Sequence, residues 1–268
     1  MADLLERASR LIQSEGFTGA HSLLFLIRYA ALTGNRQLMR LVGSTLEELS
    51  TLPESAMLAY VYAEYYEAEK EAFCPVAAGF ILDRCSGEDE MLLPALAKCA
   101  RVFRVEKYLD GALDLAEIGR DDAFAALGML EVYRATREGE YLNRAAEYAT
   151  VIRNNFDRFF DAKAAYDIEN PSANSALALV YDALARITQD EQWVEARKVH
   201  NRLISLLADR YPTRVAFGLC ALLGDYFETK TVVCAVPEGE MPPPVRTLLS
   251  FYEPLTEILV IPAKTDTA

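Results

Sequence analysis

The feature that most constrains this chain is a repeat of paired helices. Stretches that are apolar on nearly every side alternate with stretches that carry a single apolar stripe, and short polar turns separate the two kinds. The turns fall near residues 34, 71, 105, 138 and 190, a spacing of about 33 to 37 residues with one longer interval of about 52. Because one such pair cannot bury its apolar surface alone, neighbouring pairs must stack on one another.

The pattern predicts five complete helical pairs and the start of a sixth. The apolar helices are expected at residues 21–32, 55–68, 91–102, 123–136 and 175–187. Their amphipathic partners are expected at residues 37–49, 73–84, 106–118, 141–156 and 193–207. The sixth apolar helix, residues 214–227, is followed by no partner.

The two kinds of helix differ in how much of their surface they must bury. Residues 123–130 are apolar all round, as in a helix that is buried on every side, whereas residues 141–148 show one apolar and one charged face. Inner helices ringed by outer helices satisfy both patterns. We therefore expect a mostly α fold, an α/α toroid of about five to six hairpins over residues 1–228. A right-handed solenoid of hairpins is the alternative, and periodicity alone does not separate the two.

The last forty residues have a different character. Residues 231–236 and 257–261 are short, β-branched stretches, and a short helix is expected between them at residues 245–251. This order predicts a small strand-helix-strand unit, residues 229–268, packed on the toroid. The long repeat interval comes from an insertion at residues 157–172, which we expect to form an extended loop or a short hairpin that ends at Asn170-Pro171.

Composition excludes several classes of function. The 27 basic and 40 acidic residues give a net charge of −13, which argues against binding nucleic acid. The longest uncharged runs, about 11 residues, fall short of the roughly 18 that a membrane span needs. Five cysteines without a C-x-x-C pair, together with two histidines, give poor support for a metal site. We expect free thiols in the cytoplasm and no cofactor.

Several stretches resemble a known family. They are Asp121-Asp122-Ala123-Phe124, Leu130-Glu131-Val132-Tyr133, Asn170-Pro171-Ser172-Ala173-Asn174-Ser175, and the endings at residues 231–233 and 258–260. Together they resemble the C-terminal toroid of the thioredoxin-domain-containing, spermatogenesis-associated-protein-type family. That toroid is similar to six-hairpin glycosidases and to N-acylglucosamine 2-epimerase-like proteins. The resemblance covers the chain from about residue 20 onward.

The sequence also departs from the family pattern. Residues 52–57 replace the His-Phe-Glu-Lys-Met stretch of the family, and its Asp-Arg-Tyr-Ser motif is missing. The sequence holds no thioredoxin-like domain ahead of the helices, so the resemblance implies no redox chemistry. It implies a toroid that has lost polar residues of an active site, and the fold alone does not fix a substrate.

Candidate ligand-binding residues lie where the inner helices begin. If the inner helices run parallel, their N-termini share one mouth, where free N–H groups and the helix dipoles favour hydroxyls and anions. The candidates are Asp122, Ser172, Asn174, Ser175 and Arg214. Asp122 and Asn174 are favoured because the family resemblance contains their motifs. Asp, Ser and Asn are also the preferred N-caps of helices, so a purely structural role stays open.

Catalytic candidates are few. Glycoside hydrolysis would need two carboxyl groups at a defined separation, and Glu54, Asp121 and Asp122 are the candidates at the mouth. A sugar epimerase would need a well-placed base, and His21 lies at the start of an inner helix. The sequence favours a non-catalytic or catalytically reduced toroid that binds a carbohydrate-like ligand or a protein partner, such as a thioredoxin-like protein. A carbohydrate-active enzyme is the alternative.

Overall fold

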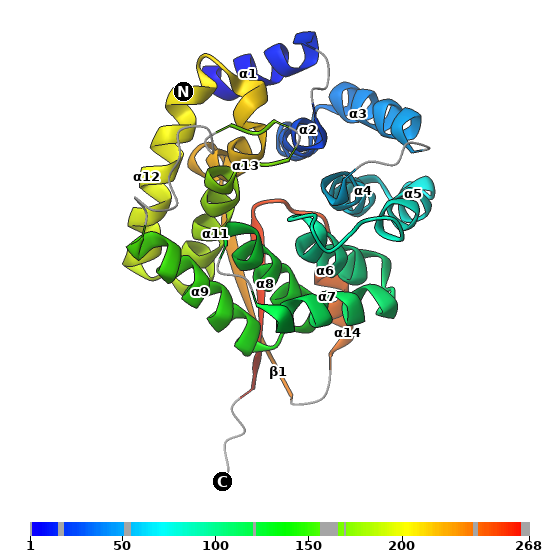
Figure 1. Ribbon diagram of the computed structural model, residues 1–268, viewed down its shortest axis with the longest axis vertical. Helices are drawn as coiled ribbons and strands as arrows, with labels where there is room; N and C mark the ends of the chain where they lie inside the picture. The colour runs from blue at the N-terminus through cyan, green and yellow to red at the C-terminus, as the bar shows by residue number, and fades with distance from the viewer. Residues whose placement is uncertain are drawn as a thin grey trace.

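The computed structural model describes residues 2–15, 19–50, 55–119, 122–155, 166–168, 170–237 and 241–263. Within these residues six helices form an inner ring. They are α2 (Ala20–Thr33), α4 (Ala56–Glu69), α6 (Leu92–Phe103), α8 (Ala123–Thr136), α11 (Ala173–Thr188) and α13 (Ala216–Tyr226). Each packs against the next in this order, and α13 packs back against α2, so that the ring closes (Figure 1). The chain is an α/α toroid, and the solenoid alternative is wrong.

A second layer of helices surrounds the ring. Its members are α3 (Arg36–Leu49), α5 (Phe73–Leu82), α7 (Glu106–Ile118), α9 (Gly139–Asn154) and α12 (Glu191–Ala208). Each packs on the inner helix that precedes it in the chain. Burial follows the sequence pattern, because α8 is buried without interruption from Ala123 to Tyr133 while α9 buries only Ala145, Ala149 and Ile152.

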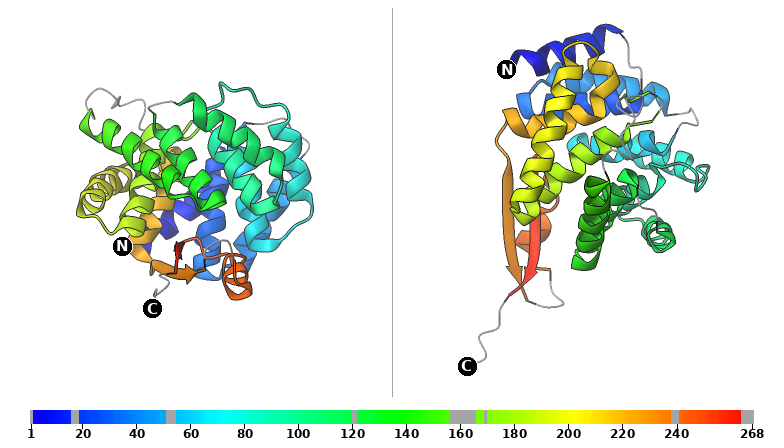
Figure 2. Two further views of the ribbon diagram at one scale, coloured as in Figure 1. Left: turned by 90° about the horizontal axis from the view of Figure 1, so that it is seen from below. Right: turned by 60° about the vertical axis from the view of Figure 1, so that its left-hand side comes forward.

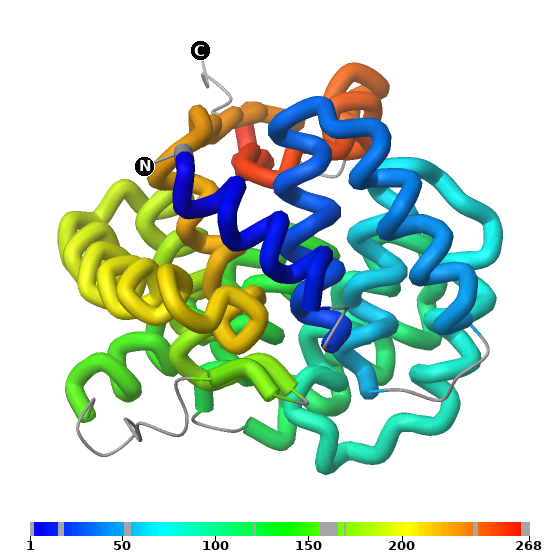
Figure 3. Tube along the Cα trace, turned by 90° about the horizontal axis from the view of Figure 1, so that it is seen from above, coloured from blue at the N-terminus to red at the C-terminus, as the bar shows by residue number. Residues whose placement is uncertain are grey.

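The N-terminus completes the sixth pair. Helix α1 (Ala2–Glu15) packs against α2, α13 and the short 3-10 helix at Pro212–Val215. Figure 3 shows α1 between α12 on one side and α3 on the other, in the position of the missing outer helix. Its buried stripe is Leu5, Ala8 and Ile12. The sixth pair is therefore formed by the two ends of the helical region, and its outer helix precedes its inner helix in the chain.

The C-terminal residues form the expected strand-helix-strand unit. Strands β1 (Lys230–Val236) and β2 (Thr256–Pro262) pair in parallel, with Val232 opposite Ile258, and α14 (Pro243–Leu248) lies between them in the chain. The two strands run along the outside of the ring below α11 (Figure 2). Residues 249–258, which we call the strap, line a cavity together with side chains of all six inner helices. The strap therefore lies across one end of the ring.

The role of α1 gives a first testable prediction. Ile12→Ala should lower the free energy of unfolding by about 2–5 kcal/mol, because it removes a side chain with 0% exposure from the contact that completes the ring. Leu11→Ala, one residue away at 41% exposure, is the matched control and should change it by less than about 0.5 kcal/mol. Urea unfolding followed by circular dichroism measures both. Equal losses for the two variants would contradict the placement of α1.

Candidate functional site

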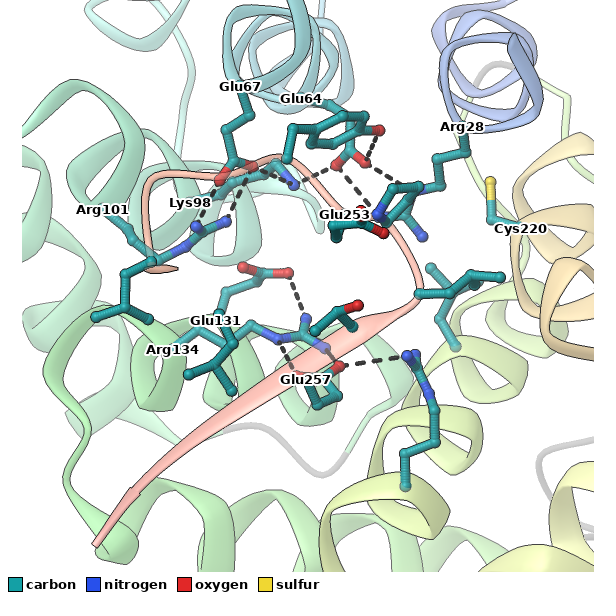
Figure 4. A pocket seen from close by; sticks show the side chains of 18 of the residues that line it. Arg28, Glu64, Glu67, Lys98, Arg101, Glu131, Arg134, Cys220, Glu253 and Glu257 are labelled. Carbon is teal, nitrogen blue, oxygen red and sulfur yellow. Dashed lines mark hydrogen bonds and ion pairs between the residues drawn. The ribbon is translucent and has the colours of Figure 1, made fainter. Parts of the chain in front are cut away.

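A polar cavity lies inside the ring at the end that the strap covers. It has a volume of about 120 Å³, and its lining comes mostly from the C-terminal halves of the inner helices and from the strap. Figure 4 shows charged side chains from opposite sides of the ring converging on it. We call it the central cavity. The apolar inner helices thus carry their few charged residues to one place.

The deeper charges form a layer of alternating sign, the inner charge layer, made of Arg28, Glu64, Lys98 and Glu131. The guanidinium of Arg28 donates to Glu64 with Nε–Oε1 at 2.8 Å, and the Lys98 ammonium also donates to Glu64. Lys98 lies over the ring of Tyr60, 4.3 Å from its centroid. The Tyr60 hydroxyl donates to Glu131 at 2.8 Å. Each member comes from a different inner helix, so the layer joins α2, α4, α6 and α8.

One helical turn closer to the strap lies an outer charge layer, made of Glu67, Arg101, Arg134 and Arg186. Arg101 forms a bidentate pair with Glu67, with N–O distances of 2.6 and 3.1 Å. The outer charge layer has no acid of its own between Arg134 and Arg186. The carboxylate of Glu257, from β2, lies between these two arginines. Arg134 donates to this carboxylate and Arg186 approaches it at 3.6 Å (Figure 4). The strap thus adds a carboxylate between two arginines that also pair with acids of the ring, Arg134 with Glu131 and Arg186 with Asp182.

The strap makes two further contacts with the ring. The Tyr252 hydroxyl donates to Glu64 at 2.8 Å, and Arg137 donates to the backbone carbonyl of Ile258 at 2.9 Å. Arg137 stands at the left-handed C-cap of α8, with φ at +67°. These hydrogen bonds place the strap directly on the two charge layers.

Three of the carboxylates that line the central cavity are held ionised. Burial opposes ionisation of Glu64, but the charges of Arg28 and Lys98 outweigh it and hold the pKa of that carboxyl well below its usual range. In the same way burial opposes ionisation of Glu131, yet Arg134 and its other cationic neighbours lower its pKa to about 2. Despite its burial, Arg134 and Arg186 lower the pKa of Glu257. These three groups are proton-free at neutral pH.

The predicted ligand-binding residues lie at the opposite end of the ring. Asp122 caps α8, and its Oδ1 accepts from the N–H groups of Phe124 and Ala125 at 3.0 and 2.8 Å. Ser172 caps α11, where its Oγ accepts from the Ser175 N–H at 3.1 Å.

The other predicted residues at this end differ in exposure. Asn174 and Ser175 are buried in the first turn of α11. Arg214 is exposed, with its guanidinium 5.9 Å from the ring of Tyr166. The structure thus brings Ser172, Asn174 and Ser175 together, while Asp122 belongs to another helix. A ligand-binding role for these residues stays a prediction.

The catalytic candidates divide in the same way. Glu54 and Asp121 lie outside the described residues. His21 is buried at the start of α2, and burial lowers its pKa although Asp167 opposes this.

Sequence reasoning missed the carboxylate beside His21. Asp167, in the insertion, accepts from the N–H groups of Ser172 at 2.7 Å and Phe217 at 2.8 Å, so it caps both α11 and α13. Burial raises its pKa, since it forms no ion pair with a Lys or Arg of the described residues. Apart from its place beside Asn170-Pro171, no signal in the sequence marks Asp167.

A sequence signal for the central cavity did exist. Charged residues recur at three-residue steps in helices that are otherwise apolar, namely Glu64, Glu67 and Lys70, then Lys98, Arg101 and Arg104, then Glu131, Arg134 and Arg137. Corresponding members lie 33 or 34 residues apart, as the repeat does. Because charged side chains are rarely buried unless they are paired, such triplets indicate ion pairs inside the ring.

Comparisons with known proteins bear on the fold only. No family model matches the sequence, and no curated protein matches it. Among solved structures, the Lin0763 protein from Listeria innocua is similar, with a TM-score of 0.56 and 11% sequence identity over 78% of this chain and 86% of that chain. This likeness supports the helical fold. The resemblance to the thioredoxin-domain-containing family stays a prediction.

Two further observations concern the described part of the chain. It holds no group of three or more His, Cys, Asp or Glu side chains placed to bind a metal ion. None of its helices is long and apolar enough to cross a membrane.

The charge layers predict how stability depends on pH. Glu131→Gln should lower the free energy of unfolding at pH 7 by about 3–5 kcal/mol, because it breaks a buried ion pair. The folded-state pKa of Glu131 lies near 2 and its usual value is 4.5. Its contribution is therefore complete above pH 4.5 and is lost as the pH falls towards 2. The difference in stability between wild type and Glu131→Gln should narrow over that range.

Urea unfolding at pH 7, 4 and 3 measures this difference. The control is Glu117→Gln, since Glu117 is exposed on α7 and lies 3.8 Å from its nearest cation, Arg144. It should stay within about 0.5 kcal/mol of wild type at each pH. A difference for Glu131→Gln that does not change with pH would show that this carboxylate is not held ionised by its neighbours.

Proposed function

We propose that this protein is a binding toroid without a catalytic step of its own, and that its ligand is a carbohydrate-like small molecule held in the central cavity under the strap. The observation that carries the proposal is the fully ionised, paired state of the cavity carboxylates Glu64, Glu131 and Glu257. These three carboxylates can hold a ligand, but they have no proton to give it at neutral pH.

The chemistry of the lining suits hydroxyl groups. A sugar hydroxyl both donates and accepts hydrogen bonds, and the cavity offers acceptors on Glu64 and Glu131 and donors on Arg28, Lys98 and Arg134. Leu127 and Leu179 supply apolar surface for the C–H groups of a sugar ring.

A carbohydrate-active enzyme is the alternative, and the electrostatics support it less well. Glycoside hydrolysis needs a carboxylic acid with a raised pKa to protonate the leaving oxygen. The pKa values of Glu64 and Glu131 are lowered instead. The group with a raised pKa is Asp167, but it is buried at the other end of the ring, where backbone N–H groups occupy both its oxygens.

A thermal-shift panel of neutral sugars tests the proposal. Wild type should gain about 2.7 kcal/mol of stability at a sugar concentration 100 times the dissociation constant. Leu179→Phe should abolish the gain, because Leu179, at 8% exposure, lines the cavity and a larger side chain would fill it. Leu206→Phe, at 68% exposure on α12, is the control and should keep the gain.

Two additional measurements separate the alternatives. Asp122→Asn keeps a good helix cap but removes a charge. If the sugar-induced gain in thermal stability is lost in this variant alone, the ligand site lies at the N-terminal end of the ring. Turnover of 4-nitrophenyl glycosides that disappears in Glu131→Gln would establish an enzyme. A flat sugar panel, with recovery of a thioredoxin-like protein in a pull-down, would replace the sugar by a protein partner.

A further inference from the structure

A second hollow lies beside the strap, on the rim of the ring. It has a volume of about 440 Å³ and lies among the C-terminal ends of α4, α6 and α8 and helix α14. We call it the rim crevice. Its charged lining residues are one carboxylate, Glu67, and six cations, which are Lys70, Arg101, Arg104, Arg134, Arg137 and Arg246. This is a strong local excess of positive charge in a chain with a net charge of −13.

Two of the six cations are already neutralised. Arg101 pairs with Glu67, and Arg134 pairs with Glu131 and Glu257. The other four, Lys70, Arg104, Arg137 and Arg246, form no ion pair with a carboxylate among the described residues. The rim crevice therefore carries about four positive charges that the described chain does not balance.

Arg137 shows the cost of this arrangement most clearly. Its side chain is partly buried and donates a hydrogen bond to a neutral acceptor, the carbonyl of Ile258. Burial, together with repulsion from Arg101 and Arg134, lowers the pKa of Arg137. A guanidinium withdrawn from water among like charges is stabilised by an anion placed beside it.

Helix dipoles explain only part of the cluster. Lys70, Arg104 and Arg137 are the left-handed C-caps of three successive inner helices, where a cation complements the negative end of the dipole. Arg246 has no such role towards the ring, because it comes from α14 on the opposite wall, where its Nε donates to the Met241 carbonyl. Cations that face one hollow from both walls indicate a ligand between them.

We propose that the rim crevice binds the phosphate group of a small phosphorylated molecule through Arg104, Arg137, Arg246 and Lys70. The planar guanidinium group can donate two parallel hydrogen bonds to two phosphate oxygens. A phosphate group also carries up to two negative charges, which would offset the excess of cations. The volume of about 440 Å³ lies within the range of small-molecule sites, about 300–1,000 Å³. The inference goes beyond the proposed function and does not require a sugar in the central cavity.

Isothermal titration calorimetry of the full chain tests the proposal. The ligands are inorganic phosphate and, separately, glucose 6-phosphate, and sodium chloride holds the ionic strength constant. Both should bind saturably at one site. Arg104→Gln and Arg137→Gln should each weaken binding by about tenfold or more, the effect of losing one charge-assisted hydrogen bond. Arg104 is exposed, so its variant should fold even if the Arg137 variant does not.

Lys198→Gln is the matched control, because Lys198 is an exposed cation on outer helix α12 in a surface ion pair with Glu195. It should bind phosphate as wild type does. Equal heats from chloride alone, or unchanged affinity in Arg104→Gln, would overturn the proposal. Unphosphorylated glucose, titrated in parallel, reports on the central cavity. If glucose does not bind, the phosphate result still tests the rim crevice, and if phosphate does not bind, the glucose result still tests the central cavity.

Discussion

The buried carboxylate of Glu64 joins three parts of the molecule that are far apart in the chain. It extends from α4 and accepts hydrogen bonds from Arg28 on α2, Lys98 on α6 and Tyr252 in the strap. Removing a carboxylate from water costs several kcal/mol unless its partners are all in place. The spacing of three inner helices and the seating of the strap therefore depend on the same charge.

The strap is part of the electrostatics of the ring, because its acid completes a layer of the ring. In the outer charge layer Arg134 and Arg186 each pair with an acid of their own helix, Glu131 and Asp182, and Glu257 lies between the two arginines and joins them. The strand pairing of β1 with β2 fixes where that carboxylate sits. Both proposed ligand sites consequently share one end of the molecule, the central cavity beneath the strap and the rim crevice beside it.

The helical pairs and the two strands could be predicted because burial leaves a direct trace in the sequence. A helix such as α8 must be apolar on every side, whereas α9 needs one apolar stripe. The site could not be found by the same means, since Glu131 alone hardly alters the apolar character of α8. The polar residues that stand out in the sequence are those at the helix N-termini, such as Asp122 and Ser172, and in the structure these two act as caps.

The sequence by itself determined five of the six helical pairs, the character of their helices and the strand-helix-strand ending, because these follow from local periodicity and from the need to bury apolar surface. Tertiary structure alone decided that α13 packs back on α2, that α1 serves as the sixth outer helix, and that charges from four inner helices meet in one layer. It also decided that Glu257 completes the outer charge layer. The contacts of α1 with α13 and of Arg134 with Glu257 join residues more than a hundred positions apart, and those of the inner charge layer span 34 to 71 positions. Their energy depends on a distance between atoms that only the closed ring sets.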